Sequence, residues 1–303
     1  MTCVTGGDSG RGVDRVLALR DGRRLAWCER GDPQGRPLLS LHGTPGSRLH
    51  GAAHEPLWHE LGLRVISADR PGFGGSTRLP GRGIGVVADD LAELLDHAGL
   101  DRVPVFGASG GGPHVLALCA RHPDRVAAAT VVGGAAPAEE SDLPQMIPIN
   151  AEAWRRAHDG GWVAVYELLH EQRTRVLPDP LAVFRDLMTT APAQDLEIMA
   201  DPRWQEAFIA DVREALRQGA EGWADEGYVF AFGWDVDAED VRVPVVWWHG
   251  RHDANIPLSA VHRLLAKMPT VELRLWETAG HLEMFRRMRE LLTDLLERTE
   301  SRT

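Results

Sequence analysis

The chain of 303 residues is predicted to form an α/β fold, in which helices flank a mostly parallel sheet and a helical insertion interrupts the core. Short apolar runs bounded by turn residues alternate with segments of helical periodicity, the pattern of a parallel sheet covered by helices. This alternation stops between about 136 and 237, where strand-like runs largely vanish. We therefore expect a core domain over residues 1–136 and 237–303 and a helical cap, or lid, over residues 137–236.

The core strands are expected to be short and apolar. Residues 16–20 and 24–29 flank an Asp-Gly turn and are predicted to form an opening hairpin. The loops after the next two expected strands should lie at the carboxyl edge of the sheet, where α/β proteins build their sites. The remaining strands are expected at 38–41, 63–68, 103–106, 126–132, 243–248 and 271–276.

Helices are expected between these strands. Apolar positions recur at mostly three- and four-residue intervals from 86 to 98, and Gly99 follows as a cap. Further helices are expected at 115–121, at 258–266 and in a closing segment whose apolar stripe includes Met284 and Leu295. Asp-Pro pairs at 179–180 and 201–202 indicate helix starts within the insertion. The insertion also holds five of the ten tryptophans, at positions 154, 162, 204, 223 and 234.

Composition narrows the class of partner. A net charge of −11 argues against binding nucleic acid, which requires clustered cationic side chains. Three cysteines, at positions 3, 28 and 119, are too few and too scattered for a disulfide framework and fit a reducing compartment. Residues 1–13 do not have the composition of a signal peptide, and no apolar run has the length of a membrane span. We expect a cytoplasmic protein that binds a small-molecule substrate. The sequence does not indicate its oligomeric state.

The strongest local signal is Gly107-Ala108-Ser109-Gly110-Gly111, a G-x-S-x-G motif between an expected strand and an expected helix. A serine on so sharp a turn takes strained backbone angles, and glycine neighbours let the turn form while the hydroxyl projects outward. The motif predicts that Ser109 is a nucleophile.

A serine hydroxyl needs a base within hydrogen-bond reach and a third group that orients the base. Asp253 follows the strand expected at 243–248, and His281 follows the strand expected at 271–276. The order Ser109, Asp253, His281 predicts an acid and a base for the nucleophile. His252, beside Asp253, could be mistaken for the base in place of His281. Asp235 and Asp237 are weaker candidates for the acid, because they precede the strand.

The oxyanion of such a reaction needs two N–H donors. Gly110 is expected to supply one from its backbone, and Thr44, in the loop 42–47, is expected to supply the second. His42 is interpreted as a buttress of this loop. No metal or organic cofactor is expected. His50 and His54 have an H-x-x-x-H spacing but lack the accompanying glutamate, and we interpret them as part of a loop or helix surface.

These segments together resemble the α/β-hydrolase superfamily. The matching pieces are His42-Gly43-Thr44-Pro45-Gly46, the run Asp69 to Ser76, the serine turn, Gly250 to Asp253, and Gly280-His281. The resemblance implies that Asp69 to Ser76 is a structural marker and that the insertion covers the active site. Haloalkane dehalogenases and epoxide hydrolases of this fold use an aspartate nucleophile, where this chain has Ser109. The loop at 42–46 is similar to that of proline iminopeptidases and their relatives, which prefer glycine in place of Thr44.

Three functions remain open from the sequence. The first is a serine esterase of the Ser-His-Asp type, which cleaves a partly apolar ester, thioester or lactone through an acyl-enzyme. The second keeps the same residues for amide, peptide or carbon–carbon bond hydrolysis, or for acyl transfer and cyclisation. The third is a ligand-binding protein with little turnover, because fold alone does not fix function. Glu139 and Glu140 are candidates to bind a substrate amine, although a solvated helix start explains them as well.

Overall fold

The computed structural model describes residues 13–232 and 234–301; Cys3 and residues 1–12 lie outside this range. Its described part contains one eight-stranded sheet in the order β1-β2-β4-β3-β5-β6-β7-β8. The pairs β1–β2 and β2–β4 are antiparallel, and every other pair is parallel. The strands are β1 (Val13–Ala18), β2 (Arg24–Gly31), β3 (Arg36–Leu41), β4 (Leu63–Ala68), β5 (Val103–Ala108), β6 (Val126–Val132), β7 (Val245–Gly250) and β8 (Val271–Trp276). The predicted mostly parallel sheet is therefore confirmed.

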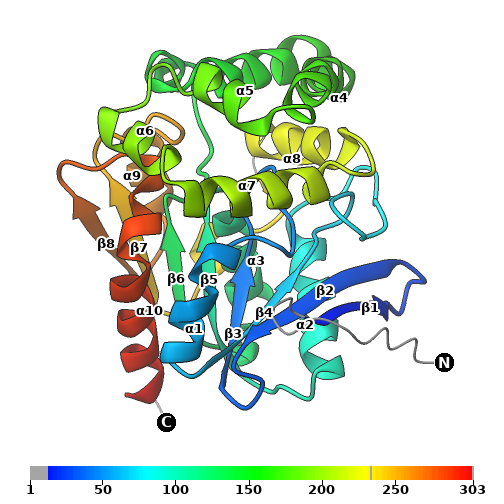
Figure 1. Ribbon diagram of the computed structural model, residues 1–303, viewed down its shortest axis with the longest axis vertical. Helices are drawn as coiled ribbons and strands as arrows, with labels where there is room; N and C mark the ends of the chain where they lie inside the picture. Colours follow the sequence, from blue (N-terminus) through cyan, green and yellow to red (C-terminus); the bar gives the residue numbers. More distant parts are fainter. Residues whose placement is uncertain (1–12, 233, 302–303) are drawn as a thin grey trace.

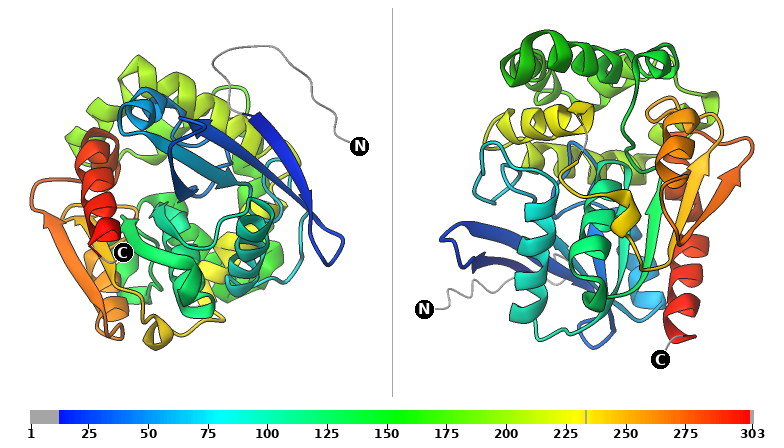
Figure 2. Two further views of the ribbon diagram at one scale, coloured as in Figure 1. Left: turned by 90° about the horizontal axis from the view of Figure 1, so that it is seen from below. Right: turned by 180° about the vertical axis from the view of Figure 1, so that it is seen from behind.

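Helices cover both faces of the sheet (Figures 1 and 2). On one face, α1 and α10 pack against Leu38, Val65 and Val246. On the other face, α2, α3 and α9 pack against Leu39, Val105 and Trp247. Alternate strand residues thus face opposite layers, as the pleat of a strand requires. These helices are α1 (Glu55–Glu60), α2 (Gly85–His97), α3 (Gly112–Arg121), α9 (Leu258–Leu265) and α10 (Met284–Glu300).

A third layer of helices lies over the carboxyl edge of the sheet (Figure 1). We call it the α4–α8 layer. It has its own apolar core around Val165, Leu169 and Val212, and Phe73 from the loop after β4 packs into that core. This contact joins the layer to the sheet. Its helices are α4 (Pro148–Val176), α5 (Pro180–Leu187), α6 (Ala193–Met199), α7 (Pro202–Ala215) and α8 (Glu221–Phe232).

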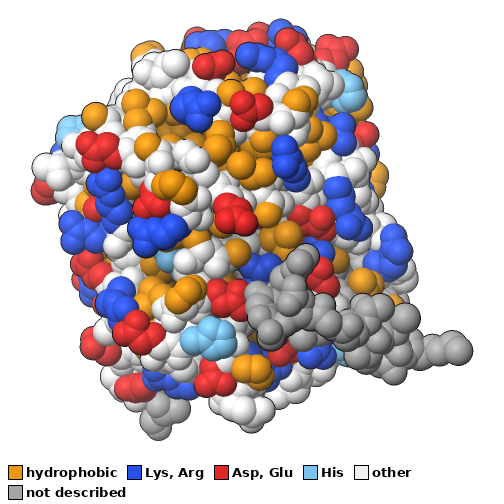
Figure 3. All heavy atoms as spheres, viewed as in Figure 1, with side chains coloured by type: hydrophobic (Ala, Val, Ile, Leu, Met, Phe, Trp, Pro, Cys, Tyr) orange, Lys and Arg blue, Asp and Glu red, His pale blue; other side chains and the backbone are white. Residues whose placement is uncertain are grey.

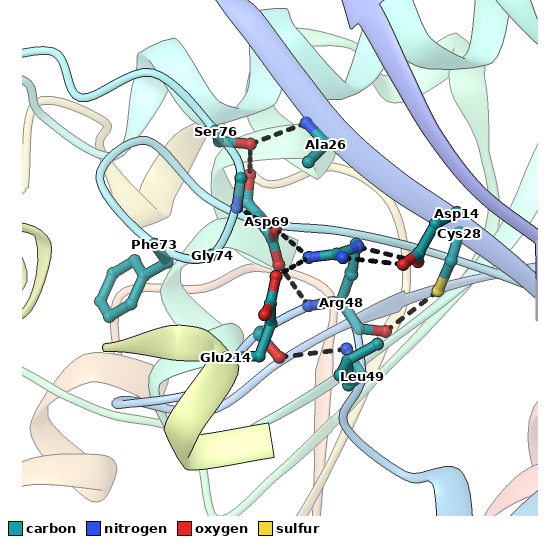
Figure 4. Close-up of polar contacts among 12 residues, drawn as sticks. Asp14, Ala26, Cys28, Arg48, Leu49, Asp69, Phe73, Gly74, Ser76 and Glu214 are labelled. Atoms are coloured by element: carbon teal, nitrogen blue, oxygen red, sulfur yellow. Dashed lines mark hydrogen bonds and ion pairs between the residues drawn. The ribbon is translucent and has the colours of Figure 1, made fainter. Parts of the chain in front are cut away.

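Hydrogen bonds connect the run from Asp69 to Ser76 internally and to Arg48 (Figure 4). The Asp69 carboxylate accepts bonds from the backbone N–H of Arg48 at 2.6 Å, from its guanidinium at 2.7 Å, and from the N–H of Gly75 at 2.7 Å. Gly74 has a φ of 46°, and a side chain there would overlap the carboxylate. Asp69 is fully buried and its carboxylate bonds to Arg48 and Gly75, in agreement with a structural role.

Cys28 and Cys119 are free and buried, and burial raises the pKa of each thiol to about 12. Such thiols behave as small apolar side chains. Within residues 13–232 and 234–301, no helix combines the length and apolarity needed to cross a membrane.

Candidate active site

Ser109 lies at the sharp turn between β5 and α3. Its φ of 51° is the one positive value found at a non-glycine residue in the described part of the chain. The turn closes because its neighbours lack side chains: a Cβ on Gly107 would overlap Val115, and a Cβ on Gly111 would overlap the carbonyl oxygen of Leu41. The strained backbone angle and the two glycines are the features that the motif predicts.

The structure brings Ser109, His281 and Asp253 together from the ends of β5, β8 and β7. Ser109 Oγ lies 3.0 Å from His281 Nε2, and His281 Nδ1 lies 2.7 Å from Asp253 Oδ2. The other carboxylate oxygen, Asp253 Oδ1, accepts the backbone N–H groups of Asn255 at 2.8 Å and Ile256 at 2.9 Å. These bonds fix the carboxylate, which fixes the imidazole with Nε2 free to accept the serine proton.

The two ionisable groups influence each other's protonation. Burial alone would lower the pKa of His281, but the charge and hydrogen bond of Asp253, helped by the charge of Asp195, raise it above the ordinary value. Burial opposes the charge of Asp253, yet the charge and hydrogen bond of His281, followed by the charge of His249 and the backbone N–H of Ile256, hold its pKa below the ordinary value. The pair is therefore arranged to stabilise an imidazolium beside a carboxylate.

Asp195, on α6, contacts the loop of His281, and the sequence does not predict this contact. Its carboxylate is 1% exposed and accepts the backbone N–H groups of His281 at 2.8 Å and Leu282 at 3.0 Å. A Cβ on Gly280 would overlap this carboxylate, which explains the glycine before the histidine. The α4–α8 layer thus holds the histidine loop directly.

The other candidates for base, acid and amine-binding residue lie elsewhere. The side chain of His252 is exposed. Asp235 accepts the N–H groups of Ile84 at 2.7 Å and Gly85 at 3.0 Å at the start of α2. Asp237 precedes a short 3-10 helix at Ala238–Asp240. Glu139 begins another 3-10 helix at Glu140–Gln145, where it forms a capping box with Asp142, so its position is that of a helix start.

The backbone N–H groups of Thr44 and Gly110 lie on adjacent segments near Ser109. A Cβ built on Gly110 would lie 3.1 Å from Thr44 N, so these two segments touch. The N–H of Thr44 has no acceptor within the described residues. His42 is fully buried, donates from Nδ1 to the Gly43 carbonyl at 2.8 Å and accepts the Arg70 N–H at Nε2 at 3.2 Å. Its ring therefore supports the loop.

Two cavities meet at Ser109. The first has a volume of about 200 Å³ and extends under α5, α6 and α7. His281 and Asp211 line it together with mostly apolar side chains, among them Leu181, Phe184, Met188, Ile198, Trp204 and Phe208. On the face shown in Figure 3, hydrophobic side chains gather at the height of α5 and α7, two of the helices that line this cavity.

The second cavity, of about 110 Å³, extends under α4 and α8. It shares Thr44 and Ser109 with the first cavity and adds Gly110. Its wall is apolar and includes Ala136, Ile149, Ala153, Trp154, Trp223 and Phe230. Three of the five tryptophans of the insertion thus line a cavity, and Trp162 instead stacks on Tyr166.

The expectation that His50 and His54 form a surface is wrong for His54. The ring of His54 is 5% exposed and packs against Trp204 and Phe285, at centroid distances of 4.6 and 6.1 Å. Both covering residues are far away in sequence, so the local spacing could not reveal them. His50 donates from Nδ1 to the carbonyl of Ser47 at 3.0 Å, so its Nε2 accepts the hydroxyl of Ser40 at 2.8 Å. Among the residues that the structure places, no group of three or more His, Cys, Asp or Glu is arranged to hold a metal ion.

The sheet order and the loops at its carboxyl edge are those of the α/β-hydrolase class. A family described as "alpha/beta hydrolase fold" matches residues 36–286, and the chain belongs to this family.

Several relatives and solved structures resemble the chain along most of its length. The chain is 30% identical over 270 residues to 2-hydroxy-6-oxo-2,4-heptadienoate hydrolase of Pseudomonas putida, covering 86% of this chain and 89% of that protein. It is also 30% identical over 250 residues to pimeloyl-[acyl-carrier protein] methyl ester esterase of Aromatoleum aromaticum, covering 77% and 89%. The crystal structure of the enol-lactonase from Burkholderia xenovorans superposes with a TM-score of 0.63 at 21% identity, covering 93% and 100%.

Proposed function

We propose that the protein is a serine hydrolase that cleaves an uncharged, partly apolar ester, thioester or lactone through an acyl-enzyme on Ser109. The observation that carries this proposal is the 3.0 Å contact of Ser109 Oγ with His281 Nε2 at the junction of two apolar cavities. His281 is in turn held by Asp253 at 2.7 Å. An esterase and a lactonase among the similar proteins fit the same chemistry.

The geometry supports a two-step reaction. Ser109 Oγ attacks the carbonyl carbon while His281 Nε2 takes the hydroxyl proton, and the N–H groups of Thr44 and Gly110 receive the developing oxyanion. His281 then gives this proton to the leaving alcohol or thiol as the carbon–oxygen or carbon–sulfur bond breaks. Water then attacks the acyl carbon while His281 Nε2 takes one of its protons, and the bond from the acyl carbon to Ser109 Oγ breaks. The acid leaves, and His281 returns the proton to Ser109 Oγ.

The two cavities are proposed to hold the two halves of the substrate. The leaving group must lie beside His281, because His281 protonates it, and His281 lines the first cavity only. The acyl part is then placed in the second cavity, beside the N–H of Gly110. The α4–α8 layer, which forms the outer walls of both cavities, acts in this proposal as the cap that selects the substrate.

The charge of the lining favours neutral substrates. Neither cavity is lined by lysine or arginine within the described residues, and Asp211 is the one carboxylate. A substrate carboxylate would find no cation there to compensate its lost hydration. This lining disfavours a dienoate such as the one named for the Pseudomonas relative, although its 30% identity makes carbon–carbon bond hydrolysis the second candidate.

The proposed function is tested with the Ser109→Ala variant. We expect the parent protein to hydrolyse small p-nitrophenyl esters and to be labelled by a fluorophosphonate probe, and the variant to lose both properties. Labelling that persists in the variant would overturn the assignment of Ser109. Incorporation of labelled oxygen from water into the acid product separates hydrolysis from cyclisation. Slow single turnover with a retained adduct would instead indicate a binding protein.

A panel of neutral esters and carboxylate-bearing dienoates separates the two hydrolytic candidates. We expect turnover of the esters and none of the dienoates. The reverse result would favour carbon–carbon bond cleavage.

A further inference from the structure

The peptide unit between Gly43 and Thr44 carries both the carbonyl oxygen of Gly43 and the N–H of Thr44. Arg70, in the loop after β4, donates from Nη2 to this carbonyl at 2.9 Å and from Nη1 to the carbonyl of His42. A hydrogen bond at the oxygen of a peptide polarises the N–H at its other end and fixes its direction. Arg70 therefore acts on the N–H that is proposed to receive the oxyanion.

Glu226, on α8 of the α4–α8 layer, holds Arg70 in a two-pronged contact. Arg70 Nε lies 2.5 Å from Glu226 Oε1, and Nη2 lies 2.8 Å from Oε2. The same carboxylate accepts the hydroxyl of Thr44 at 2.5 Å. Glu226 is fully buried and Arg70 is 3% exposed, so water does not compete for these bonds. A planar guanidinium between two acceptors has one orientation, which a lysine could not reproduce.

The cluster around Glu226 carries an excess of positive charge. Arg82 Nη2 lies 2.9 Å from Glu226 Oε1, and His114 Nε2 lies 3.1 Å from the same oxygen. Burial lowers the pKa of His114 to about 4, so its ring is neutral at pH 7. Among the groups bonded to Glu226, two arginines and one carboxylate are charged, an excess of one positive unit in this cluster, and the carboxylate of Asp211 also acts on Arg70. This field favours negative charge on the other side of the Gly43–Thr44 peptide.

We propose that Arg70 and Glu226 are positioning residues, which orient and polarise the Gly43–Thr44 peptide so that its N–H stabilises the oxyanion. The α4–α8 layer then contributes to rate as well as to substrate selection, since α8 supplies Glu226. This inference rests on the proposed function, because it requires an oxyanion to form at Ser109.

The test compares Arg70→Lys and Glu226→Gln with a matched control. Asp225, the neighbour of Glu226 on α8, pairs with Arg78 at 2.7 and 2.8 Å and accepts the indole N–H of Trp162 at 2.7 Å, but it does not line either cavity. Asp225→Asn therefore removes another two-pronged ion pair between α8 and the loop after β4, one in which the arginine is 30% exposed.

With a p-nitrophenyl ester, we expect kcat to fall about 10- to 100-fold in both positioning variants, which is part of the roughly 100- to 1000-fold effect of a lost oxyanion donor. KM should stay within about threefold of the parent value, because ground-state binding does not use this peptide. An alkyl boronic acid, whose adduct with serine places an oxygen in the oxyanion site, should bind more weakly in proportion to the loss of kcat. Asp225→Asn should change each quantity less than about threefold. Equal kcat values in the folded positioning variants and the control would overturn the proposal.

A second pair of variants decides the question if the charge changes prevent folding. Thr44→Val removes the hydroxyl that contacts Glu226 and Arg70 and leaves the charges and the peptide in place. We expect kcat to fall about 10-fold and Thr44→Ser to restore it, with little change in melting temperature. A Thr44→Val protein with parental kcat would contradict the proposal. If the fluorophosphonate probe failed to label Ser109 in the parent protein, the proposed function itself would be wrong.

Discussion

The carboxylate of Asp195 accepts the backbone N–H groups of His281 and Leu282, at 2.8 and 3.0 Å. These two bonds join α6 to the loop that carries the proposed general base, so the outer helices and the histidine form one unit. The charge of Asp195 also adds to that of Asp253 in raising the pKa of His281. Its effect is therefore both geometric and electrostatic.

Asp195→Asn should move the pH dependence of kcat/KM. The base form of His281 is required, so the rate rises as pH passes upward through its pKa. Removing a neighbouring negative charge disfavours the imidazolium and lowers this pKa. We expect the acidic limb of the profile to shift to lower pH by about 1 unit, the lower end of the effect of one nearby charge, because Asp195 acts on His281 less strongly than Asp253 does.

Glu197→Gln is the matched control for this measurement. Glu197 lies on the same helix but pairs with Arg286 at the exposed surface, at 3.1 Å. Its removal should leave the acidic limb in place. An unchanged or upward-shifted limb in Asp195→Asn would show that Asp195 does not act on the base.

Much of the core could be predicted from the sequence, because local patterns determine it. The bounds of β4, β6 and β8 agree residue for residue with the expected strands, since β4 and β6 are mostly apolar runs and the first residues of β8 alternate between apolar and charged side chains. The loops with Ser109, Asp253 and His281 follow parallel strands, so they had to meet at one edge of the sheet. The catalytic roles of these residues stay predictions until the proposed variants are measured.

The contacts made by the α4–α8 layer could not be predicted in this way. Asp195, Asp211 and Glu226 lie on the helices α6, α7 and α8, and an acidic residue on a helix is usually solvated. Which of them turns inward depends on how five helices pack over the sheet, and no sequence spacing encodes that packing. One residue of the sequence does reflect this packing: Gly280 lies where a side chain would overlap Asp195.

The strained backbone of Ser109 predicts a difference in stability between two inactive variants. Ser109→Gly and Ser109→Ala should both be inactive. Only glycine adopts the φ of 51° without a clash at Cβ, so the glycine variant should be more stable than the alanine variant by about 1 kcal/mol. Urea denaturation of the two inactive proteins measures the difference. Equal stability would mean that the turn relaxes when the serine is removed.

The assignment of the two cavities predicts reciprocal changes in specificity. Ala207 lines the first cavity and Ala153 lines the second. Ala207→Trp should reduce kcat/KM for esters of bulky alcohols by about 10-fold or more and spare long acyl chains, whereas Ala153→Trp should do the opposite, because steric overlap in a packed pocket costs a few kcal/mol. Each variant is the control for the other, and kcat/KM over a matrix of acyl and alcohol lengths measures both. If both variants lost the same substrates, the assignment would fail.

Asp211 predicts a pH-dependent loss of stability. Burial raises its pKa to about 7, although Ser47 donates to its Oδ1 from the backbone at 2.8 Å and from the hydroxyl at 2.6 Å. The folded protein thus binds this proton more tightly than the unfolded chain, so the free energy of unfolding falls as pH rises from about 4 to about 7. At about 1.4 kcal/mol per pKa unit, the loss is at most about 4 kcal/mol.

Asp211→Asn keeps an acceptor for Ser47 and should abolish this slope, giving a more stable protein at pH 8 and equal stability near pH 4. Chemical denaturation across this range measures the slope, with the exposed Glu206→Gln on the same helix as control; a slope that survives in Asp211→Asn would assign it to another group.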